Sequence, residues 1–527
     1  MNRLDLTDRD DRLLHKVLRC QAEQSGDEVF MMAGERRWSF AEVNQRANEY
    51  AAGLRARGVE LGDTVAVLME SCPEFVLLTL AVNKLGAVWV PTNVDYKGEW
   101  LRQSLVDSRA RVLVVDGALL ARVTGLGEGL PFEHVVVRTE GVELDLAVAG
   151  AGDPGGEGHY GDTAAVLWTS GTTGRAKGVM QSHNAWLRGA ESGATTSGAR
   201  DDDVMYCCLP MHNSAAWVAV VYRALVCGLP FGLDPRFSVQ DFWDRVRFYG
   251  ATQTFTLGAM HMFLWNQPER ADDADNPVRV ASCIPMPEAL LDPFKHRFGI
   301  DQIYQGYGQS EVLGLVSRVD DGTRTWSADT AGVPLPGLDV RVLDDDDHEV
   351  NIGDVGELCV RPTEPHVLFN GYFNDPEATL RAFRNLWYHT GDLGRRNEEG
   401  EYFFFDRKAD YIRYKGRSVS SFAIEAAVTA HPEVVECAAY GVTSDELASE
   451  AEIKVDVVLQ PGSLVKPDEL ARFVNDNAPY FFVPRYIEVV DGLPHTPTGR
   501  VQKYLVRQRG LTDATWDRDA TGFVVER

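Results

Sequence analysis

Short strand patterns alternate with amphipathic helix patterns through the first half of this chain. Residues 40–55 predict an amphipathic helix, residues 64–68 a buried strand and residues 74–85 a second helix. Three more strands are predicted at residues 87–90, 111–115 and 164–168. Strands that alternate with helices favour parallel βαβ units over a β-sandwich. We therefore expect an α/β fold with parallel sheets in this part of the chain.

The pattern changes at about residue 331, where Gly and Pro interrupt short strands, as in GVPLPGLDVRVL and VGELCVRP. This predicts a small antiparallel, barrel-like β subdomain. After Asp406, strand and helix patterns alternate as in a compact α+β module, and the charged stretch DRKADYIRYKGR is predicted to be the linker. We therefore predict a large N-terminal domain at residues 1–406, a hinge at residues 407–412 and a small mobile α+β domain at residues 413–527.

Length and charge narrow the class of protein. The 527 residues suffice for two to four domains at roughly 100 to 200 residues each. Hydrophobic residues at 44% exclude a mostly disordered chain. With 78 acidic and 52 basic residues, the formal charge of −26 argues against general binding to nucleic acids or anionic membranes. The acidic run at residues 344–347 is expected to be a solvated turn between strands.

The N-terminus and the cysteines predict a cytoplasmic protein without a membrane span. The first residues, MNRLDLTDRDDRLL, contain no apolar signal-peptide core. The longest apolar stretch, residues 214–222, is about half as long as a membrane-spanning helix. The eight cysteines form no CxxC pair and no Cys/His group at zinc-binding spacing. We expect them to be free buried thiols in a reducing compartment.

One segment predicts a phosphate site. In VLWTSGTTGRAKGVMQSH (residues 166–183) a buried strand ends at Trp168, and glycines, hydroxyl side chains and Lys177 follow. Glycines let the backbone turn its N–H groups toward an anion, hydroxyls add donors, and the lysine adds positive charge. The spacing differs from that of a Walker loop. The segment therefore predicts a cradle for a polyphosphate.

TSGTTGRAKGV resembles the signature of the adenylate-forming superfamily, which comprises acyl-CoA synthetases, luciferases and the adenylation domains of peptide synthetases. Six further segments are similar to its motifs and follow in the same order: KLGAVWVPTN (84–93), QGYGQSE (305–311), GELCVRP (356–362), WYHTGDLG (387–394), DRKADYI (406–412) and PTGRVQK (497–503). The likeness covers nearly the whole chain. The chain is thus identified as a member of the AMP-dependent acyl-CoA synthetase family, with motifs most similar to the crotonobetaine/carnitine-CoA ligase group.

The resemblance implies a reaction in two steps. A carboxylate attacks the α-phosphate of ATP to give an acyl-adenylate and pyrophosphate. A thiol, usually that of CoA, then takes the acyl group and releases AMP. The first step builds negative charge on phosphate oxygens, so positioned donors and cations should supply the catalysis. We expect ATP and Mg²⁺ as cofactors, CoA as co-substrate, and a small or aromatic carboxylic acid as substrate.

The resemblance also implies which residues contact the nucleotide. The β- and γ-phosphates are expected to contact seven residues: Thr169, Ser170, Gly171, Thr172, Thr173, Gly174 and Lys177. In QGYGQSE, Gly306 and Tyr307 are expected to pack along the adenine. Ser310 is expected to contact phosphate, and Glu311 to bind Mg²⁺, which prefers few carboxylates together with phosphate oxygens.

The ribose and acyl sites are implied in the same way. Asp392 is expected to bind the ribose hydroxyls, because a carboxylate accepts two hydroxyl donors. Arg407 is expected to support the ribose or a phosphate, with a structural ion pair as the alternative. His212 matches an aromatic position between the acyl pocket and the thiol tunnel. Asn213 and Trp217 are expected to line the pocket, where the bulk of Trp217 would shorten it unless it is simply a core aromatic.

Three positions depart from the family pattern. The lysine that bridges the substrate carboxylate and the α-phosphate is replaced by Arg500, with Lys503 three residues further on. Arginine keeps the charge but lacks the compact ammonium group. We favour Arg500 for this catalytic role, and the alternatives are that Lys503 reaches in or that adenylation is retuned. The segment ASCIPMPEAL (281–290) is bulkier than the usual adenine-side loop, and Ala409 replaces the usual Lys or Asp of the hinge.

Other functions remain open on the sequence alone. One is a diazotase that activates nitrite as an adenylate and forms a diazo group on an aryl amine. Others are an enzyme that loads a carrier protein and a nucleotide-binding pseudo-enzyme. The basic residues Arg413, Lys415 and Arg417 would suit the phosphates of CoA, although a solvated turn explains them equally well. The acyl substrate, the acceptor and the oligomeric state, including a homodimer, are not decided by the sequence.

Overall fold

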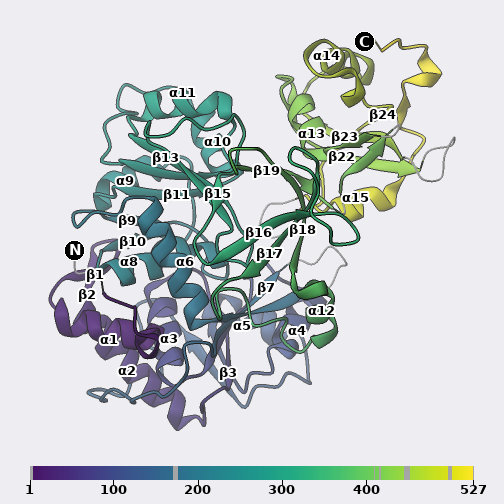
Figure 1. The fold of residues 1–527 in the computed structure, drawn as a ribbon. Helices are drawn as coiled ribbons and strands as arrows, with labels where there is room; N and C mark the ends of the chain where they lie inside the picture. Colours follow the sequence, from purple (N-terminus) through teal and green to yellow (C-terminus); the bar gives the residue numbers. More distant parts are fainter. Residues whose placement is uncertain are drawn as a thin grey trace.

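A computed structural model describes residues 4–169, 176–408, 410–414, 417–443, 451–495 and 501–525. It shows two large sheets with helices packed between and around them, a smaller antiparallel sheet, and a separate α+β unit at the C-terminal end of the chain (Figure 1). The α/β class, the parallel sheets and the division into a large and a small part are as predicted. The predicted boundaries at residues 406 and 412 remain predictions.

A six-stranded sheet carries the predicted phosphate loop. Its order is β6-β5-β3-β4-β7-β8, and all neighbouring strands are parallel except β7 and β8. The strands are β3 (Thr64–Leu68), β4 (Val88–Pro91), β5 (Val112–Asp116), β6 (His134–Arg138), β7 (Thr163–Thr169) and β8 (Lys177–Ser182). The strands predicted from the apolar runs agree with these bounds within a residue or two. Such runs predict strands well because parallel sheets are buried on both faces.

A nine-stranded sheet forms the second half of the large domain, in the order β15-β14-β13-β12-β11-β9-β10-β1-β2. Its inner strands are parallel, and β2, β14 and β15 add antiparallel edges. The strands are β1 (Val29–Ala33), β2 (Arg36–Ser39), β9 (Met205–Cys207), β10 (Phe231–Leu233), β11 (Gln253–Leu257), β12 (Val280–Ile284), β13 (Gln302–Tyr307), β14 (Val316–Asp320) and β15 (Val333–Pro334). Its strand β13 leads directly into the QGYGQSE motif.

Helices connect these strands and cover the sheets. The helices are α1 (Leu14–Gln24), α2 (Phe40–Ala56), α3 (Pro73–Lys84), α4 (Gly98–Asp107), α5 (Gly117–Thr124), α6 (His183–Thr196), α7 (Ser214–Ala216), α8 (Tyr222–Cys227), α9 (Phe242–Tyr249), α10 (Ala259–Trp265), α11 (Glu288–Phe298) and α12 (Pro376–Ala382), with short turns η1 (Arg9–Asp11), η2 (Trp217–Val221) and η3 (Arg384–Leu386). The predicted helix at residues 40–55 is α2. It begins where it does because Ser39 and Glu42 form a capping box.

The main hydrophobic core lies between the two large sheets. It combines side chains of α1, α2, α3, α6 and α8 with inward-facing residues of both sheets. Its centre is aromatic: Trp89 lies 4.7 Å from Trp217 and 6.3 Å from Trp186, measured between ring centroids. All three indoles are fully buried. The core packs against β4 and β7, and the predicted phosphate loop begins after β7.

The Gly- and Pro-rich segment folds into a four-stranded antiparallel sheet, as predicted. Its strands are β16 (Leu338–Leu343), β17 (Gly356–Pro362), β18 (Tyr388–Arg396) and β19 (Tyr402–Arg407). The acidic run at residues 344–347 forms the turn between β16 and β17, and Asp344, Asp345 and Asp346 are exposed, as expected for a solvated turn. Asp347 is the exception. The Asp347 side chain is only 7% exposed, because it pairs with Arg384 at 2.6 Å. A charged run can therefore place one member inward when a distant arginine compensates its charge.

The C-terminal unit contains a four-stranded sheet, a separate two-stranded sheet and its own hydrophobic core. Its elements are β20 (Ile412–Tyr414), β21 (Arg417–Val419), α13 (Ser421–Thr429), β22 (Val434–Thr443), β23 (Ala451–Leu459), α14 (Pro467–Asn477), η4 (Tyr480–Phe482), β24 (Tyr486–Val489), α15 (Lys503–Arg509), β25 (Trp516–Asp517) and η5 (Asp519–Thr521). It connects to the large domain directly after β19. The Ser421 amide donates to Asp406 Oδ2 at 2.6 Å across this connection.

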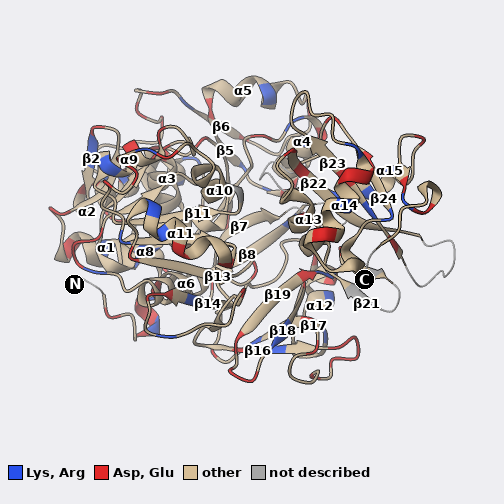
Figure 2. Cartoon of the chain, turned by 90° about the horizontal axis from the view of Figure 1, so that it is seen from above, with Lys and Arg blue, Asp and Glu red and all other residues tan. Residues whose placement is uncertain are grey.

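Acidic and basic residues are intermixed along the chain in the view from above (Figure 2). Within the described residues, no helix combines the length and the apolar character needed to cross a membrane. The eight cysteines are free, and all except Cys20 are buried, as expected.

Candidate active site

The predicted phosphate loop connects the last two strands of the six-stranded sheet. β7 ends at Thr169 and β8 begins at Lys177, and these two residues lie opposite one another in the antiparallel pair. The Thr169 hydroxyl donates to the Lys177 carbonyl at 3.3 Å. The sheet thus fixes both ends of the loop. The remaining predicted phosphate ligands lie outside the described residues: Ser170, Gly171, Thr172, Thr173 and Gly174.

Lys177 and Glu311 both contact Tyr372. The Lys177 Nζ lies 4.8 Å from the centroid of the Tyr372 ring, and the Tyr372 hydroxyl donates to Glu311 Oε1 at 3.0 Å. Glu311 is 9% exposed, and this burial raises the pKa of its carboxyl, against the effects of the Tyr372 hydrogen bond and the Lys177 charge. A buried carboxylate beside a lysine fits Mg²⁺ bound to a polyphosphate, since Mg²⁺ takes few carboxylates when phosphate oxygens are available.

Asp392 lies at the centre of a second polar cluster. Its Oδ2 accepts hydrogen bonds from the Tyr307 hydroxyl and from Gln309 Nε2, the latter at 2.7 Å. Its Oδ1 lies 3.3 Å from Arg407 Nε but has no hydrogen-bond donor among the described residues. The side chain is 1% exposed. A buried carboxylate with one oxygen still short of donors suits the hydroxyls of a ribose.

Gln309 connects the two clusters. Its Oε1 accepts from the Tyr388 hydroxyl at 2.7 Å, while its Nε2 bonds to Asp392. The Tyr388 and Tyr372 rings both pack on Phe369, at 5.2 and 5.0 Å between centroids. Asp392 and Glu311, the carboxylates predicted to bind the ribose and Mg²⁺, therefore share one aromatic wall.

The adenine-side segment ASCIPMPEAL is anchored from two sides. The Met286 amide donates to Gln305 Oε1 at 3.0 Å, and the buried His261 Nε2 lies 2.8 Å from the Pro285 carbonyl oxygen. Burial lowers the pKa of His261 to about 4, so the ring is neutral at neutral pH. Next to this segment, a Cβ on Gly306 would lie 2.7 Å from a carbonyl oxygen of β14, so only glycine fits there. These contacts thus hold the segment ASCIPMPEAL in place, although its sequence departs from the family pattern.

His212 and Ser310 lie near the start of α7. The Ser310 hydroxyl is 3.5 Å from that of Ser214, the first residue of α7. His212 Nε2 is buried without a hydrogen-bond partner among the described residues, and burial lowers the pKa of the imidazole to about 4. A neutral ring with an unsatisfied nitrogen offers one polar contact to a bound molecule.

Trp217 belongs to the aromatic core. Its side chain is fully buried, and its Nε1 donates to the Met211 carbonyl at 2.7 Å. Its ring packs against Trp89 and, at 5.9 Å between centroids, against Phe75. Asn213, which precedes α7, is half-buried. The predicted pocket roles of Asn213 and Trp217 remain predictions, and the full burial of Trp217 agrees with the alternative that it is a core aromatic.

Lys503 is engaged within the C-terminal unit. Its Nζ donates to Ser421 Oγ at 2.6 Å and pairs with Glu425 Oε1 at 2.8 Å, and the side chain is 14% exposed. Both partners lie on α13. Three further residues named in the sequence analysis lie outside the described residues: Ala409, Lys415 and Arg500. The side chains of Arg413 and Arg417 are likewise not described.

The sequence did not single out Tyr372, Gln309 or Tyr388. Gln309 and Tyr388 stand inside the quoted motifs QGYGQSE and WYHTGDLG, next to residues that were named. Tyr372 stands in FNGYFND, between two motifs, where an aromatic residue follows a glycine. That local pattern is a weak signal, because its partner Glu311 is 61 positions away.

Tyr372→Phe is expected to weaken the apparent Mg²⁺ affinity by about 10-fold while ATP binding without metal stays unchanged. The substitution removes the donor that orients Glu311, and such supporting hydrogen bonds typically contribute about 10- to 100-fold to metal affinity. The measurement is the Mg²⁺ dependence of pyrophosphate release at saturating ATP. An unchanged Mg²⁺ dependence would show that Tyr372 does not orient the metal ligand.

The fold and the two carboxylate clusters define an adenylate-forming enzyme. A family model described as AMP-binding enzyme matches residues 18–373, and one described as AMP-binding enzyme C-terminal domain matches residues 423–500. The chain therefore belongs to the AMP-binding enzyme family. This confirms the predicted family and the predicted class, an AMP-forming acyl-CoA synthetase.

Individual relatives are similar over nearly their whole length. The crotonobetaine/carnitine–CoA ligase of Salmonella agona (strain SL483) is 29% identical over 89% of this chain and 92% of its own. The corresponding ligase of Escherichia coli O157:H7 is 30% identical over 88% and 92%. The crystal structure of ATP-bound MatB from Rhodopseudomonas palustris superposes with a TM-score of 0.84 at 25% identity, over 94% of this chain and 98% of MatB. The diazotase and pseudo-enzyme alternatives are not favoured by these comparisons.

Proposed function

We propose that the chain is an acid–thiol ligase that adenylates a small or aromatic carboxylic acid with Mg·ATP and transfers the acyl group to CoA. The observation that carries this proposal is the convergence of Lys177, Glu311 and Asp392, which come from three separate motifs and meet around one aromatic wall. The relatives named above are CoA ligases, which supports the acceptor.

In the first step a carboxylate oxygen attacks the α-phosphorus, and the bond to the β-phosphate oxygen breaks to release pyrophosphate. Lys177 and the loop that begins after Thr169 would hold the β- and γ-phosphates, and Ser310 would add a contact. Asp392 would anchor the ribose through Oδ1, supported by Arg407. Mg²⁺ held by Glu311 would neutralise charge on the phosphate oxygens. Arg500 would bridge the attacking carboxylate and the α-phosphate.

In the second step the sulfur of CoA attacks the acyl carbonyl carbon. The bond between this carbon and the bridging oxygen breaks, AMP leaves with that oxygen, and the thiol proton goes to solvent. His212 lies in the segment that precedes α7 and its imidazole is neutral, so it would contact the acyl group without adding a charge there. The contact of CoA with Arg413, Lys415 and Arg417, the hinge at residues 407–412 and a homodimer remain predictions.

A small or aromatic acid is favoured because the aromatic core that follows α7 is closed. Trp217, Trp89 and Phe75 are buried, pack against one another and cannot move aside without opening a cavity. A long acyl chain directed into this core would need that space, whereas a short chain or a single ring would not.

The test is pyrophosphate release with Mg·ATP against short, branched, aromatic and long-chain acids, each with and without CoA. We expect turnover that CoA stimulates with a short or aromatic acid, and none with a long-chain acid. Nitrite with and without an aryl amine belongs in the same experiment. Turnover with nitrite and an amine alone would overturn the ligase proposal, and absence of pyrophosphate with every substrate would leave a nucleotide-binding protein.

A further inference from the structure

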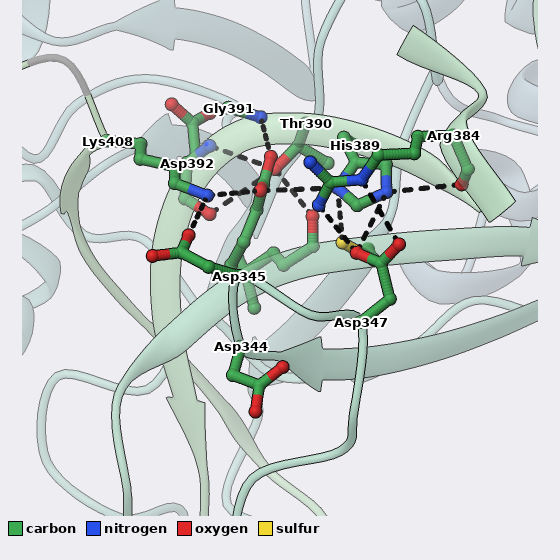
Figure 3. A network of polar contacts seen from close by, with 12 residues as sticks. Asp344, Asp345, Asp347, Arg384, His389, Thr390, Gly391, Asp392 and Lys408 are labelled. Carbon is green, nitrogen blue, oxygen red and sulfur yellow. Dashed lines mark hydrogen bonds and ion pairs between the residues drawn. The ribbon is translucent and has the colours of Figure 1, made fainter. Parts of the chain in front are cut away.

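Glu357, Cys359 and His389 lie together on β17 and β18, close to Asp347 and Lys408 (Figure 3). His389 Nδ1 is 3.2 Å from Glu357 Oε2 and 3.3 Å from Cys359 Sγ. These residue types can bind a transition metal. Besides His389, Glu357 already has two further protein donors: the Gly391 amide donates to Oε1 at 3.0 Å, and Lys408 Nζ donates to Oε2 at 3.0 Å. The clustering of these side chains is therefore better explained by their contacts with the Glu357 carboxylate than by a bound metal ion.

The position of Gly391 explains why its backbone N–H requires a side-chain acceptor, which Glu357 provides. Cys359 lies opposite His389 in the β17–β18 pair, whereas Glu357 lies opposite Leu393, so β18 contains a bulge between these pairs. Gly391 sits in the bulge with φ of 72°, a conformation that favours glycine. A bulge takes backbone groups out of the ladder. Glu357 accepts the freed N–H, and the Lys408 amide donates to the Gly391 carbonyl at 2.9 Å.

The residue after Gly391 is Asp392, the predicted ribose ligand. The bulge thus determines where the Asp392 carboxylate points, and Glu357 determines the shape of the bulge. Glu357 is 6% exposed, and burial opposes its charge. Hydrogen bonds from His389 and Lys408 outweigh this effect and lower the pKa of Glu357 to about 2, so the carboxylate is ionised at any assay pH.

Lys408 belongs to the predicted hinge. It contributes two of the contacts described here, its backbone amide to Gly391 and its Nζ to Glu357. The Nζ also pairs with Asp345 at 2.8 Å, but Asp345 is 89% exposed, so this second pair is weak. Lys408 of the predicted hinge is therefore bonded to the bulge in two ways, directly through its backbone amide and indirectly through the buried Glu357 carboxylate.

We propose that Glu357 is a positioning residue for the nucleotide: it fixes the bulge that presents Asp392 to the ribose, and through Lys408 it ties this bulge to the hinge. The inference rests on the proposed function, because it needs Asp392 to bind ATP. Glu357 would then help to determine the affinity for the nucleotide, although it contacts neither ATP nor the acyl group.

Steady-state pyrophosphate release with the best acid of the panel tests the proposal. Glu357→Ala is expected to raise KM for ATP about tenfold with less than a threefold change in kcat, because it displaces a binding group and leaves the reacting atoms in place. Glu357→Gln keeps an acceptor for the Gly391 amide and should restore most of the affinity. Lys408→Met should raise KM for ATP by a smaller factor, about two- to fourfold.

Two controls separate positioning from general damage. In an Asp392→Asn background, Glu357→Ala should add no further increase in KM for ATP, because the group that it positions is already lost. Glu349→Ala, which removes a carboxylate paired with Arg341 at 2.7 Å and Arg396 at 3.1 Å near the same sheet, should leave KM unchanged.

Three results would overturn the proposal: an unchanged KM for ATP in Glu357→Ala, a full additional increase in the Asp392→Asn background, or stoichiometric zinc in the purified protein whose removal reproduces the Glu357→Ala defect. A wild-type protein that releases no pyrophosphate with any substrate would instead refute the proposed function itself. The two failures are therefore distinguishable.

Discussion

Lys177→Met lowers kcat/KM for pyrophosphate release by about 100- to 1,000-fold, the largest effect that we expect from a single described residue. The reason is electrostatic. Lys177 is the first residue of β8, and its Nζ lies 4.8 Å from the centroid of the Tyr372 ring, whose hydroxyl donates to Glu311. The lysine therefore stands at the end of the predicted phosphate loop and shares Tyr372 with the predicted Mg²⁺ ligand. Methionine keeps the length of the side chain and removes the charge that stabilises the transition state.

The matched control is Lys16→Met on α1. Lys16 Nζ donates to the Asp10 carbonyl at 2.6 Å, far in the sequence from every predicted site motif. We expect unchanged kinetics for this variant and unchanged thermal unfolding for both. A loss of less than threefold in Lys177→Met would mean that the lysine does not contact phosphate, and the site would then have to be reassigned.

Arg500→Ala is the second variant with a large expected effect, about 100- to 1,000-fold on the adenylation step. The chain has arginine where the family has its catalytic lysine, and the only other candidate nearby in the sequence is Lys503. Lys503 is already bonded to Ser421 and Glu425. We therefore expect Arg500→Lys to keep at least about a tenth of the activity, since the charge is retained.

Lys503→Met separates the two candidates. It leaves Glu425 as a buried carboxylate without its cation, and burial already raises the pKa of Glu425. The expected result is a lower thermal midpoint of the C-terminal unit and less than a tenfold loss in adenylation. If Lys503→Met lost 100-fold or more with normal unfolding while Arg500→Ala stayed active, Lys503 would be the catalytic residue. Single-turnover formation of the acyl-adenylate is the measurement.

The secondary structure was largely predictable, because its signals are local. The apolar run of residues 64–68 became β3 with the same bounds, and the pattern of residues 40–55 became α2. Each of these elements buries a face that its own sequence displays. The antiparallel sheet was predicted for the same reason, from strands that Gly and Pro separate.

The contacts that define the site were not predictable from the sequence. The motifs named Glu311 and Asp392 one by one, but the Tyr372 bond to Glu311 and the Gln309 bond to Asp392 join positions 61 and 83 residues apart. Asp347 looked like part of a solvated run, and only the fold brings Arg384 within 2.6 Å of it. Such contacts depend on the register of the strands, as the bulge that contains Gly391 illustrates.

The central claim is that a carboxylic acid is activated by attack on the α-phosphate of ATP. The most direct measurement uses an acid labelled with ¹⁸O in its carboxylate, incubated with Mg·ATP, CoA and the wild-type protein. The account predicts AMP that carries one ¹⁸O atom in its phosphate, together with unlabelled pyrophosphate, because the bridging oxygen of the acyl-adenylate leaves with AMP. ADP together with labelled inorganic phosphate, or AMP without label, would contradict it.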